Sequence, residues 1–296
     1  MNGADMVLSM RTANNKEPIN SREQPTESLW RGIVSFWGQE GQRLKAPVEH
    51  QPCGLVLVCE HASNRFETPW GTLGLDTETT TSHIAWDLGA LRLAKKLAAN
   101  LAPVTGGTVL IHAPLSRLIY DLNRSPDQQD AMPDQSEAYA IPGNKSLGLS
   151  QRLERTRSLY LPFHTSVHEE ICRILAQGKR PLLLTIHSFT PVYNGKQRDV
   201  EFGVIHDTDD TLAKAIVTAA SRSNLDTRLN EPYSARDGVT HTLKLHATPY
   251  NLAHAMLEIR NDLLTNSQTE AKVTRQLTEI LTTAFQSPGV PSCLAS

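Results

Sequence analysis

Residues 55–64 (LVLVCEHASN) determine the fold that we expect for this chain. The run LVLVC at 55–59 is short, continuous and apolar, which is typical of a strand buried on both faces of a parallel sheet. Polar residues follow it at once, beginning with Glu60 and His61. A second apolar run at 181–186 (PLLLTI) is followed in the same way by His187. The chain therefore contains at least two predicted strands that end in chemically capable side chains.

The rest of the chain alternates between strand-like and helical patterns. Further strands are predicted at 108–112, 117–121, 202–206 and 255–259. The helical spacing of apolar residues predicts helices at 83–101, 149–175, 211–221 and 266–285. This alternation predicts an α/β fold with three layers, α/β/α, in which helices cover both faces of a mostly parallel mixed central sheet.

The composition is that of a soluble globular protein rather than a nucleic-acid or membrane protein. Hydrophobic residues are 39% and charged residues 20% of the 296 residues, as in ordinary globular domains. Lys+Arg number 29 against Asp+Glu 31, so no basic excess is available to neutralise a phosphate backbone. No apolar run approaches the roughly 18 residues of a membrane span. The four cysteines form no C-x-x-C pair, which argues against a disulfide framework or a zinc ribbon.

The two ends of the chain differ from its middle. Residues 1–28 are polar and aperiodic, as in a disordered leader. They lack the basic start and apolar core of a secretory signal, so we expect a cytoplasmic location. Residues 29–37 (LWRGIVSFW) are apolar enough to form a docking arm. We therefore divide the chain into a polar leader with this arm at 1–50, a globular domain at 51–286 and a loose tail at 287–296.

Side chains at the ends of three predicted strands have the chemistry of a metal site. Ligand sites in parallel sheets gather at the carboxyl ends of the strands, where His61, His187 and Glu258 are expected. Two imidazoles and a carboxylate suit zinc, and an open position on the metal would hold a reactive water. A second carboxylate could take the proton of that water. The alternative is that each histidine is a hydrogen-bonded structural residue, the commoner role for a single histidine after a buried strand.

The segment 116–126 (SRLIYDLNRSP) is a second candidate for chemistry. It contains Arg117, Asn123 and Arg124, and a planar guanidinium binds a carboxylate through two parallel hydrogen bonds. The segment is therefore a candidate clamp for an acidic group of a substrate. The alternative is that Asp121 and one of the arginines form an ion pair that orders the loop.

One further histidine and two absent motifs narrow the range of functions. His241 follows a turn-like sequence at 237–240 and is a candidate to contact substrate or to stabilise an oxyanion. The sequence has neither a G-x-S-x-G motif nor a Walker-type phosphate loop. Serine hydrolase and nucleotide hydrolase functions are therefore disfavoured.

Six motifs occur in order along the chain: EHASN at 60–64, SHIAWDLGA at 82–90, SRLIYDLNRSP at 116–126, IPGN at 141–144, IHSFTPVYNGK at 186–196 and LEIRNDL at 257–263. Together they resemble the N-formylglutamate amidohydrolase family, and the resemblance covers residues 52–285. That family is similar in fold to the zinc-dependent carboxypeptidases and aspartoacylases, which have an α/β core and one catalytic zinc. The resemblance implies a small-molecule substrate with a carboxylate: N-formyl-L-glutamate, hydrolysed to glutamate and formate.

The resemblance also implies roles for residues at the strand ends. His61 and His187 stand where the superfamily places its two zinc-binding histidines. Glu258 stands where the catalytic glutamate would be, as general base on the water and then as acid to the leaving amine. The carboxypeptidases have a glutamate three residues after the first histidine, and that position is Asn64 here. The third zinc ligand must therefore come from elsewhere.

Two carboxylates are candidates for the third ligand. Asp87 is the first choice because a matching aspartate recurs in N-formylglutamate amidohydrolases, although it could instead cap its helix or orient a ligand. Glu60 is the second choice. Neighbouring side chains of an extended segment point to opposite faces, which counts against Glu60 beside His61 unless the chain turns there.

Substrate binding is implied as well. Asn123 and Arg124 resemble the pair that grips the substrate carboxylate in the carboxypeptidases, and Arg117 would assist them. An arginine near the zinc could also stabilise the oxyanion, and the sequence does not divide the two roles. Since a fold does not fix a function, two alternatives stay open: a zinc hydrolase of the same fold acting on another small N-acyl amino acid or a peptide, and a non-catalytic protein that binds a small acid. The sequence does not indicate an oligomeric state.

Overall fold

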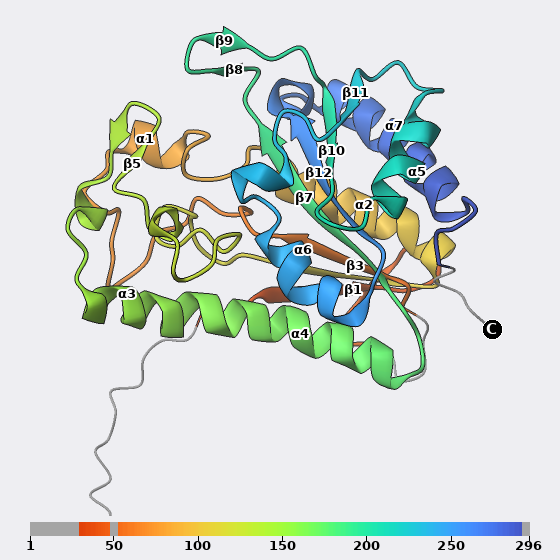
Figure 1. Cartoon of the computed structure of the whole chain (residues 1–296), viewed down its shortest axis with the longest axis horizontal. Coiled ribbons are helices and arrows are strands. Elements are labelled where there is room, and N and C mark those ends of the chain that lie inside the picture. Colours follow the sequence, from red (N-terminus) through yellow and green to blue (C-terminus); the bar gives the residue numbers. More distant parts are fainter. Residues whose placement is uncertain (1–29, 48–52, 292–296) are drawn as a thin grey trace, which may run out of the picture.

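The computed structural model describes residues 30–47 and 53–291. The predicted leader at 1–28 therefore lies outside the described residues, as does the predicted tail from residue 292. The main strands are β1 (Ile33–Trp37), β2 (Arg43–Leu44), β3 (Leu55–Cys59), β4 (Thr108–His112), β7 (Leu182–Phe189), β10 (Phe202–Ile205), β11 (Thr227–Leu229) and β12 (His254–Arg260). They form one eight-stranded sheet in the order β11-β10-β12-β7-β3-β4-β1-β2 (Figure 1).

Four parallel strands, β12, β7, β3 and β4, form the middle of the sheet. Every residue of β3 and of β4 is buried, as expected for strands covered on both faces, and both strands have the predicted bounds. β7 is longer than predicted because it continues through His187 to Phe189. His187 thus lies within a strand, directly opposite Glu258 of β12, so the sheet fixes the backbone of both residues.

Antiparallel strands extend the sheet on both sides. β10 pairs with β12, and β1 pairs with β4, which makes the sheet mixed. β1 comes from the apolar arm predicted at 29–37, and its pairing runs from Ile33 opposite His112 to Trp37 opposite Thr108. Part of this arm is therefore a strand of the main sheet, while the division of the chain at residue 51 stays a prediction.

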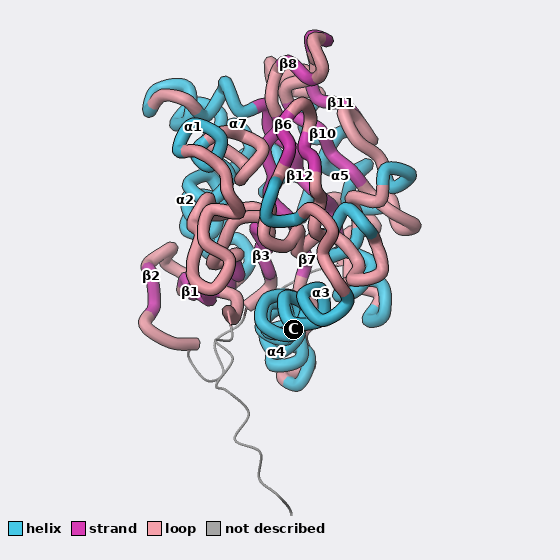
Figure 2. Tube along the Cα trace, turned by 90° about the vertical axis from the view of Figure 1, so that its left-hand side faces the viewer, coloured by secondary structure: helices cyan, strands magenta, loops and turns pink. Residues whose placement is uncertain are grey.

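Helices cover both faces of the sheet. They are α1 (Thr77–Thr81), α2 (Ala90–Thr105), α3 (Leu149–Arg155), α4 (Leu161–Ala176), α5 (Thr211–Ala220), α6 (His241–His246) and α7 (Ser267–Phe285). α7 packs against α2 and α5 on one face, and α4 and α6 lie against the other. Figure 2 shows α1 and α2 to one side of the strands and α3 and α4 below them. The predicted three-layer fold with a mostly parallel mixed sheet is confirmed.

Helix α2 begins later than the sequence predicts. Its buried face is formed by leucines spaced four residues apart, Leu93, Leu97 and Leu101. The helix starts at Ala90 rather than at 83 because Gly89, its N-cap, has φ +83°, a left-handed conformation outside the helical region. The preceding residues form turns and bends instead, and Asp87 lies among them.

The prediction of a strand at 117–121 is wrong, because the segment turns back on itself. The backbone N–H of Ile119 donates to the carbonyl of Ser116, and that of Leu118 donates to the Ser116 hydroxyl. These local bonds occupy backbone groups that a strand would offer to its neighbours. The segment is nevertheless mostly buried, which explains why its apolar pattern resembles that of a strand.

The helix predicted at 149–175 is formed by α3, a π-helical turn at Thr156–Tyr160 and α4 in succession. Two small hairpins lie outside the main sheet: β5 (Gln135–Ser136) with β6 (Tyr139–Ala140), and β8 (Val192–Tyr193) with β9 (Lys196–Gln197). Short 3₁₀ turns occur at Gln129–Ala131, Pro142–Asn144, Ala235–Asp237, Thr248–Tyr250 and Asn261–Leu264. Over the described ranges, no helix is long and apolar enough to cross a membrane.

Replacement of Gly89 by alanine tests how tightly the start of α2 is held. A Cβ at this position would lie 2.6 Å from the Cβ of Leu264, whereas at Gly178, which also has positive φ, it would meet nothing within 4 Å. Alanine is strained at both positions because φ is positive at each. The additional clash with Leu264 should make Gly89→Ala lose about 1–3 kcal/mol more stability than Gly178→Ala through overpacking. Urea denaturation measures the difference. Equal losses would show that Leu264 yields freely to the added methyl group.

Candidate metal centre and active site

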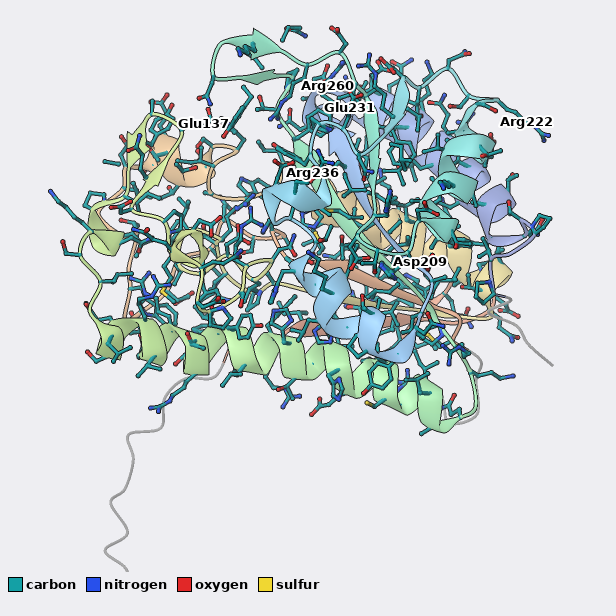
Figure 3. All side chains as sticks on the ribbon, in the orientation of Figure 1. Glu137, Asp209, Arg222, Glu231, Arg236 and Arg260 are labelled. Carbon is teal, nitrogen blue, oxygen red and sulfur yellow. The ribbon has the colours of Figure 1, made fainter. Side chains whose placement is uncertain are left out.

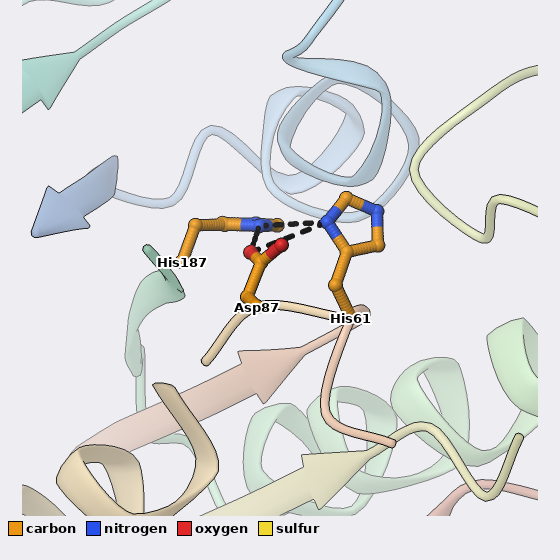
Figure 4. Close-up of side chains that lie close together, drawn as sticks. All are labelled: His61, Asp87 and His187. Atoms are coloured by element: carbon orange, nitrogen blue, oxygen red, sulfur yellow. Dashed lines mark hydrogen bonds and ion pairs between the residues drawn. The ribbon is translucent and has the colours of Figure 1, made fainter. Parts of the chain in front are cut away.

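Three side chains from separate segments meet near the carboxyl ends of the parallel strands (Figure 4). His61 follows β3 in a turn, His187 lies in β7, and Asp87 precedes α2. The two histidine Nδ1 atoms are 3.2 Å apart. Asp87 Oδ2 lies 3.0 Å from His187 Nδ1 and 3.4 Å from His61 Nδ1. Three atoms of the kinds that bind metals therefore converge from three buried side chains.

The separations of these atoms resemble the edges of a metal coordination shell. Zinc binds histidine nitrogen and carboxylate oxygen at about 2.0–2.2 Å, so neighbouring ligands of a tetrahedron lie roughly 3.3–3.6 Å apart. The three observed separations, 3.0, 3.2 and 3.4 Å, are close to this range. A divalent metal ion thus fits among the three atoms with only small adjustments of the side chains.

A carboxylate stands behind each imidazole. Nε2 of His61 lies 2.8 Å from Asp121 Oδ1, and Nε2 of His187 lies 3.2 Å from Glu60 Oε2. The hydrogen bond of His61 Nε2 with Asp121 holds the proton there and leaves the Nδ1 lone pair available to a metal. The contact of His187 with Glu60 is an ion pair without hydrogen-bond geometry, and the charge of Glu60 favours a proton on the same nitrogen. Glu60 therefore lies on the far side of the His187 ring, whereas Asp87 lies with the two Nδ1 atoms.

The electrostatics of the cluster also suit a cation. Burial by itself raises the pKa of Glu60, Asp87 and Asp121, but the neighbouring imidazoles, together with Arg117 at Asp121, outweigh burial and hold each pKa below its usual range. Burial lowers the pKa of His187, yet nearby carboxylates outweigh this and raise it well above the usual value. The same negative surroundings that hold a proton on this ring would favour a metal ion, since buried charges need partners.

Glu258 lies beside the cluster on the neighbouring strand. It pairs with His187 in the parallel register of β12 and β7, and residues directly opposite each other in a sheet share a face. Its side chain is buried, and Oε2 has no hydrogen-bond partner among the described residues. Burial raises the pKa of Glu258 to about 7. A carboxyl group with such a pKa can accept and return a proton near neutral pH.

A cavity of about 330 Å³ opens above the cluster. Six of the nine side chains predicted for the site line it: His61, Asp87, Arg117, Asn123, Arg124 and Glu258. His187 and Glu60 lie beneath its surface. His241 is not among the lining residues either, because its Nε2 is 2.8 Å from the hydroxyl of Tyr160, in the π-helical turn. The structure thus brings eight of the nine predicted residues together around one cavity. His241 does not line it, but lies near enough to Glu60, Asp121 and Arg124 for their charges to act on its pKa.

Arg117 bridges two carboxylates of the cluster. Its Nη2 donates to Asp121 Oδ2, and its Nη1 lies 3.4 Å from Asp87 Oδ1. The ion pair between Asp121 and an arginine, the alternative left open by the sequence, is therefore present. It orders the loop after β4 and at the same time connects Asp87 to the carboxylate behind His61.

Asn123 and Arg124 differ in how many of their side-chain polar atoms already form hydrogen bonds within the protein. The carboxamide of Asn123 donates to the carbonyl of Val239 and accepts from the N–H of Thr242, so it joins two loops of the cavity wall. Arg124 directs Nε to Asp130 and Nη1 to backbone carbonyls. Within the part of the chain that the structure describes, Nη2 of Arg124 makes no hydrogen bond. Arg124 is therefore the better placed of the two to bind a ligand.

The sequence did not indicate the place of Asp121 behind His61, nor that of Glu60 behind His187. The closeness of Asp121 to Asn123 and Arg124 in the DLNR sequence is a signal that its carboxylate belongs to the same site. Glu60 carries no such signal, because its direction depends on the turn that follows β3.

The family model described as N-formylglutamate amidohydrolase matches residues 53–265, most of the chain. The chain belongs to this family. The family consists of hydrolases that act on carbon–nitrogen bonds of amides, so the protein is an N-formylglutamate amidohydrolase-like hydrolase with a small-molecule substrate. The resemblance inferred from the six motifs is confirmed. A search of curated protein sequences found no match.

Solved structures resemble this chain in fold. Gene product Atu2144 from Agrobacterium tumefaciens is 42% identical over 87% of this chain and 95% of its own, with a TM-score of 0.77. N-formylglutamate amidohydrolase from Ralstonia eutropha JMP134 is 14% identical over 86% of this chain and 97% of its own, with a TM-score of 0.56, and shares the fold. A metallo-carboxypeptidase from Burkholderia cenocepacia is 10% identical over 86% of this chain and 65% of its own, with a TM-score of 0.36.

Replacement of Asp121 by asparagine tests whether this carboxylate prepares His61 for a metal. The change removes the charge behind Nε2 and keeps the shape of the side chain, so affinity for a divalent metal ion should fall about 10–100-fold. Competition with a chromogenic chelator measures the affinity. Asp130→Asn is the matched control, because Asp130 lines the same cavity and contacts Arg124 rather than a histidine. An equal loss in both variants would contradict a specific role for Asp121.

Proposed function

We propose that the protein is a zinc-dependent amidohydrolase that cleaves the amide bond of a small N-acyl amino acid. The observation that carries this proposal is the convergence of His61 Nδ1, His187 Nδ1 and Asp87 Oδ2 beside the buried carboxyl group of Glu258. Two imidazoles and one carboxylate form a donor set suited to catalytic zinc, which keeps an open position for water or substrate. The geometry favours Asp87 over Glu60 as the third ligand.

Zinc in this position would polarise the scissile carbonyl and make a water molecule more acidic. The chain supplies the remaining functions. Glu258 takes the proton of the attacking water and returns it to the leaving amine, because its carboxyl group faces the cavity and has a pKa of about 7. Arg124 binds the substrate carboxylate through Nη2. Arg117 acts mainly through Asp87 and Asp121, whose orientation it fixes.

The family points to N-formyl-L-glutamate as the first substrate to test. Its hydrolysis consumes one water and gives glutamate and formate. The cavity of about 330 Å³ is at the lower end of the range for small-molecule sites. This size favours a single acylated amino acid over a peptide chain.

Metal content and formate release provide the direct test. We expect about one zinc per chain, formate release from N-formyl amino acids, and loss of that activity with a chelator followed by recovery when zinc is restored. Zinc determination by atomic absorption and a formate dehydrogenase assay measure the two quantities. Folded protein with neither zinc nor activity after zinc addition would instead support a non-catalytic acid-binding protein.

The variant Glu258→Gln separates proton transfer from metal binding. The amide cannot accept the proton, so kcat should fall at least about 100-fold, the lower end of the contribution of general acid–base catalysis. Zinc content should stay at the level of the unchanged protein. Glu270→Gln is the matched control, because Glu270 is equally buried but lies in α7 and pairs with Lys96. Full activity of Glu258→Gln would overturn the assignment of the general base.

A further inference from the structure

The loop at residues 116–128 carries side chains of the site but has no strand to hold its backbone. It contains both arginines of the site and the carboxylate behind His61, and it lies outside the sheet. Ile119 and Leu122 of this loop are buried, and buried backbone carbonyls need hydrogen-bond donors. The donors must therefore come from another part of the chain.

One long helix supplies these donors. It consists of α3, the π-helical turn and α4, and Figure 3 shows side chains on its inner side extending toward the loops that precede α3. Nη1 of Arg155 donates to the carbonyl of Ile119 over 3.0 Å, and Nε2 of His164 donates to that of Leu122 over 2.9 Å. Nη2 of Arg152 donates to the carbonyl of Gln128 over 2.8 Å. Three side chains of the helix thus hold the backbone of the loop.

The π-helical turn brings Arg155 and His164 to the same loop. The two residues are 164 − 155 = 9 positions apart, which is about two and a half turns of an α-helix and would place them on opposite sides. In the π-helical turn Thr156–Tyr160, the carbonyl of Thr156 accepts from the N–H of Leu161, five residues later. Such a turn takes up one residue more than an α-helical turn, so it rotates His164 back toward the side that carries Arg155.

A second histidine fixes the position of the hydrogen on His164. A carbonyl oxygen only accepts, so Nε2 of His164 carries a hydrogen toward Leu122. Nδ1 of the same ring lies 2.9 Å from Nε2 of His246 in α6. In a neutral His164 this Nδ1 accepts, so His246 donates to it. Nδ1 of His246 has no hydrogen-bond partner among the described residues, as expected of a ring whose single hydrogen is directed at His164.

Both imidazoles are neutral. Their side chains are almost completely buried, and within the part of the chain that the structure describes neither ring forms an ion pair with a carboxylate. Burial lowers the pKa of His164 well below its usual value and lowers that of His246 to about 3. The hydrogen bonds from His246 to His164 and from His164 to Leu122 therefore keep the same direction around neutral pH.

We propose that His164, held in one tautomer by His246, is a positioning residue for the loop that binds the substrate carboxylate. This inference rests on the proposed amidohydrolase function and adds a residue to it. His164 does not line the cavity and acts through the carbonyl of Leu122, two residues before Arg124. Without this hydrogen bond the peptide after Leu122 is free to turn, and Arg124 loses its direction toward the cavity.

Two variants with the same carboxamide group test this role in the zinc-loaded full chain. In His164→Gln the amide nitrogen takes the place of Nε2 and can donate to Leu122, whereas in His164→Asn the shorter side chain ends near the place of Nδ1 and does not reach it. KM of the asparagine variant for N-formyl-L-glutamate should rise about two- to tenfold, the equivalent of one hydrogen bond. The glutamine variant should keep the KM of the unchanged protein.

The value of kcat separates positioning from a general loss of structure. It should change less than KM in His164→Asn, because Glu258 and His187 lie in strands that the loop does not hold. Equal KM values in the asparagine and glutamine variants would overturn the positioning role.

Hydrogen exchange separates failure of the positioning role from failure of the function, because it requires no turnover. Backbone amides of residues 116–128 should exchange faster in His164→Asn than in His164→Gln, while β3 and β7 exchange equally in both. This result together with no hydrolysis of any N-formyl compound would contradict the amidohydrolase function and support the positioning of the loop. Faster exchange throughout the sheet would contradict a positioning role.

The tautomers are measured on the unchanged protein, so this part of the test does not depend on the folding of a variant. In nitrogen NMR spectra of histidine-labelled protein at neutral pH, His164 and His246 should each show a hydrogen on Nε2 and a bare Nδ1. A doubly protonated ring, or a hydrogen on Nδ1 of His164, would overturn the proposal.

Discussion

Negative charge buried near the carboxyl ends of β3 and β7 is the constraint on which the rest of the site depends. Glu60, Asp87 and Asp121 are almost completely buried, and a buried carboxylate is stable as an anion only beside a partner of opposite charge or a strong donor. The two imidazoles and Arg117 provide these partners. Once each Nε2 faces a carboxylate, each Nδ1 is left facing Asp87, and this arrangement favours a cation.

The parallel sheet determines which side chains can meet in this way. β7 lies between β3 and β12, so the second residue after β3 and the residues near the ends of β7 and β12 are neighbours in space. This places His61, His187 and Glu258 together. The two aspartates come from loops instead: Asp87 lies just before the left-handed Gly89 that starts α2, and Asp121 lies in the turning segment after β4. The strands thus position the two histidines and Glu258, and the loops contribute the carboxylates of Asp87 and Asp121.

The metal cluster with Glu258 and the outer wall of the cavity come from different structural elements. The metal cluster and Glu258 depend on the central strands, whose register resists local change. The outer wall comes from the two small hairpins and from the loop that contains Tyr233. Loops tolerate substitution more readily than buried strands. Members of one family can therefore keep the same chemistry and differ in the side chain of the substrate that they accept, which is why family membership alone does not fix the substrate.

The sequence by itself determined the fold class and the identity of most groups at the site. Continuous apolar runs predicted β3, β4 and β7, because strands buried on both faces are apolar at nearly every position. The polar residues at the ends of these strands, or directly after them, indicated the site. Periodicity failed at 117–121 because a buried turn and a buried strand are equally apolar. It also misplaced the start of α2, since the spacing of apolar residues does not indicate that Gly89 adopts a left-handed conformation.

Only the tertiary structure decided how the groups are used. It placed Asp87 with the two Nδ1 atoms and Glu60 behind His187, and it directed Arg117 to two carboxylates. It also paired His241 with Tyr160, outside the cavity lining. The type of each residue, which the sequence gives, determines which groups its side chain can bind. The direction in which a side chain points depends on turns, helix starts and contacts between residues far apart in the sequence, and local patterns carry no information about these.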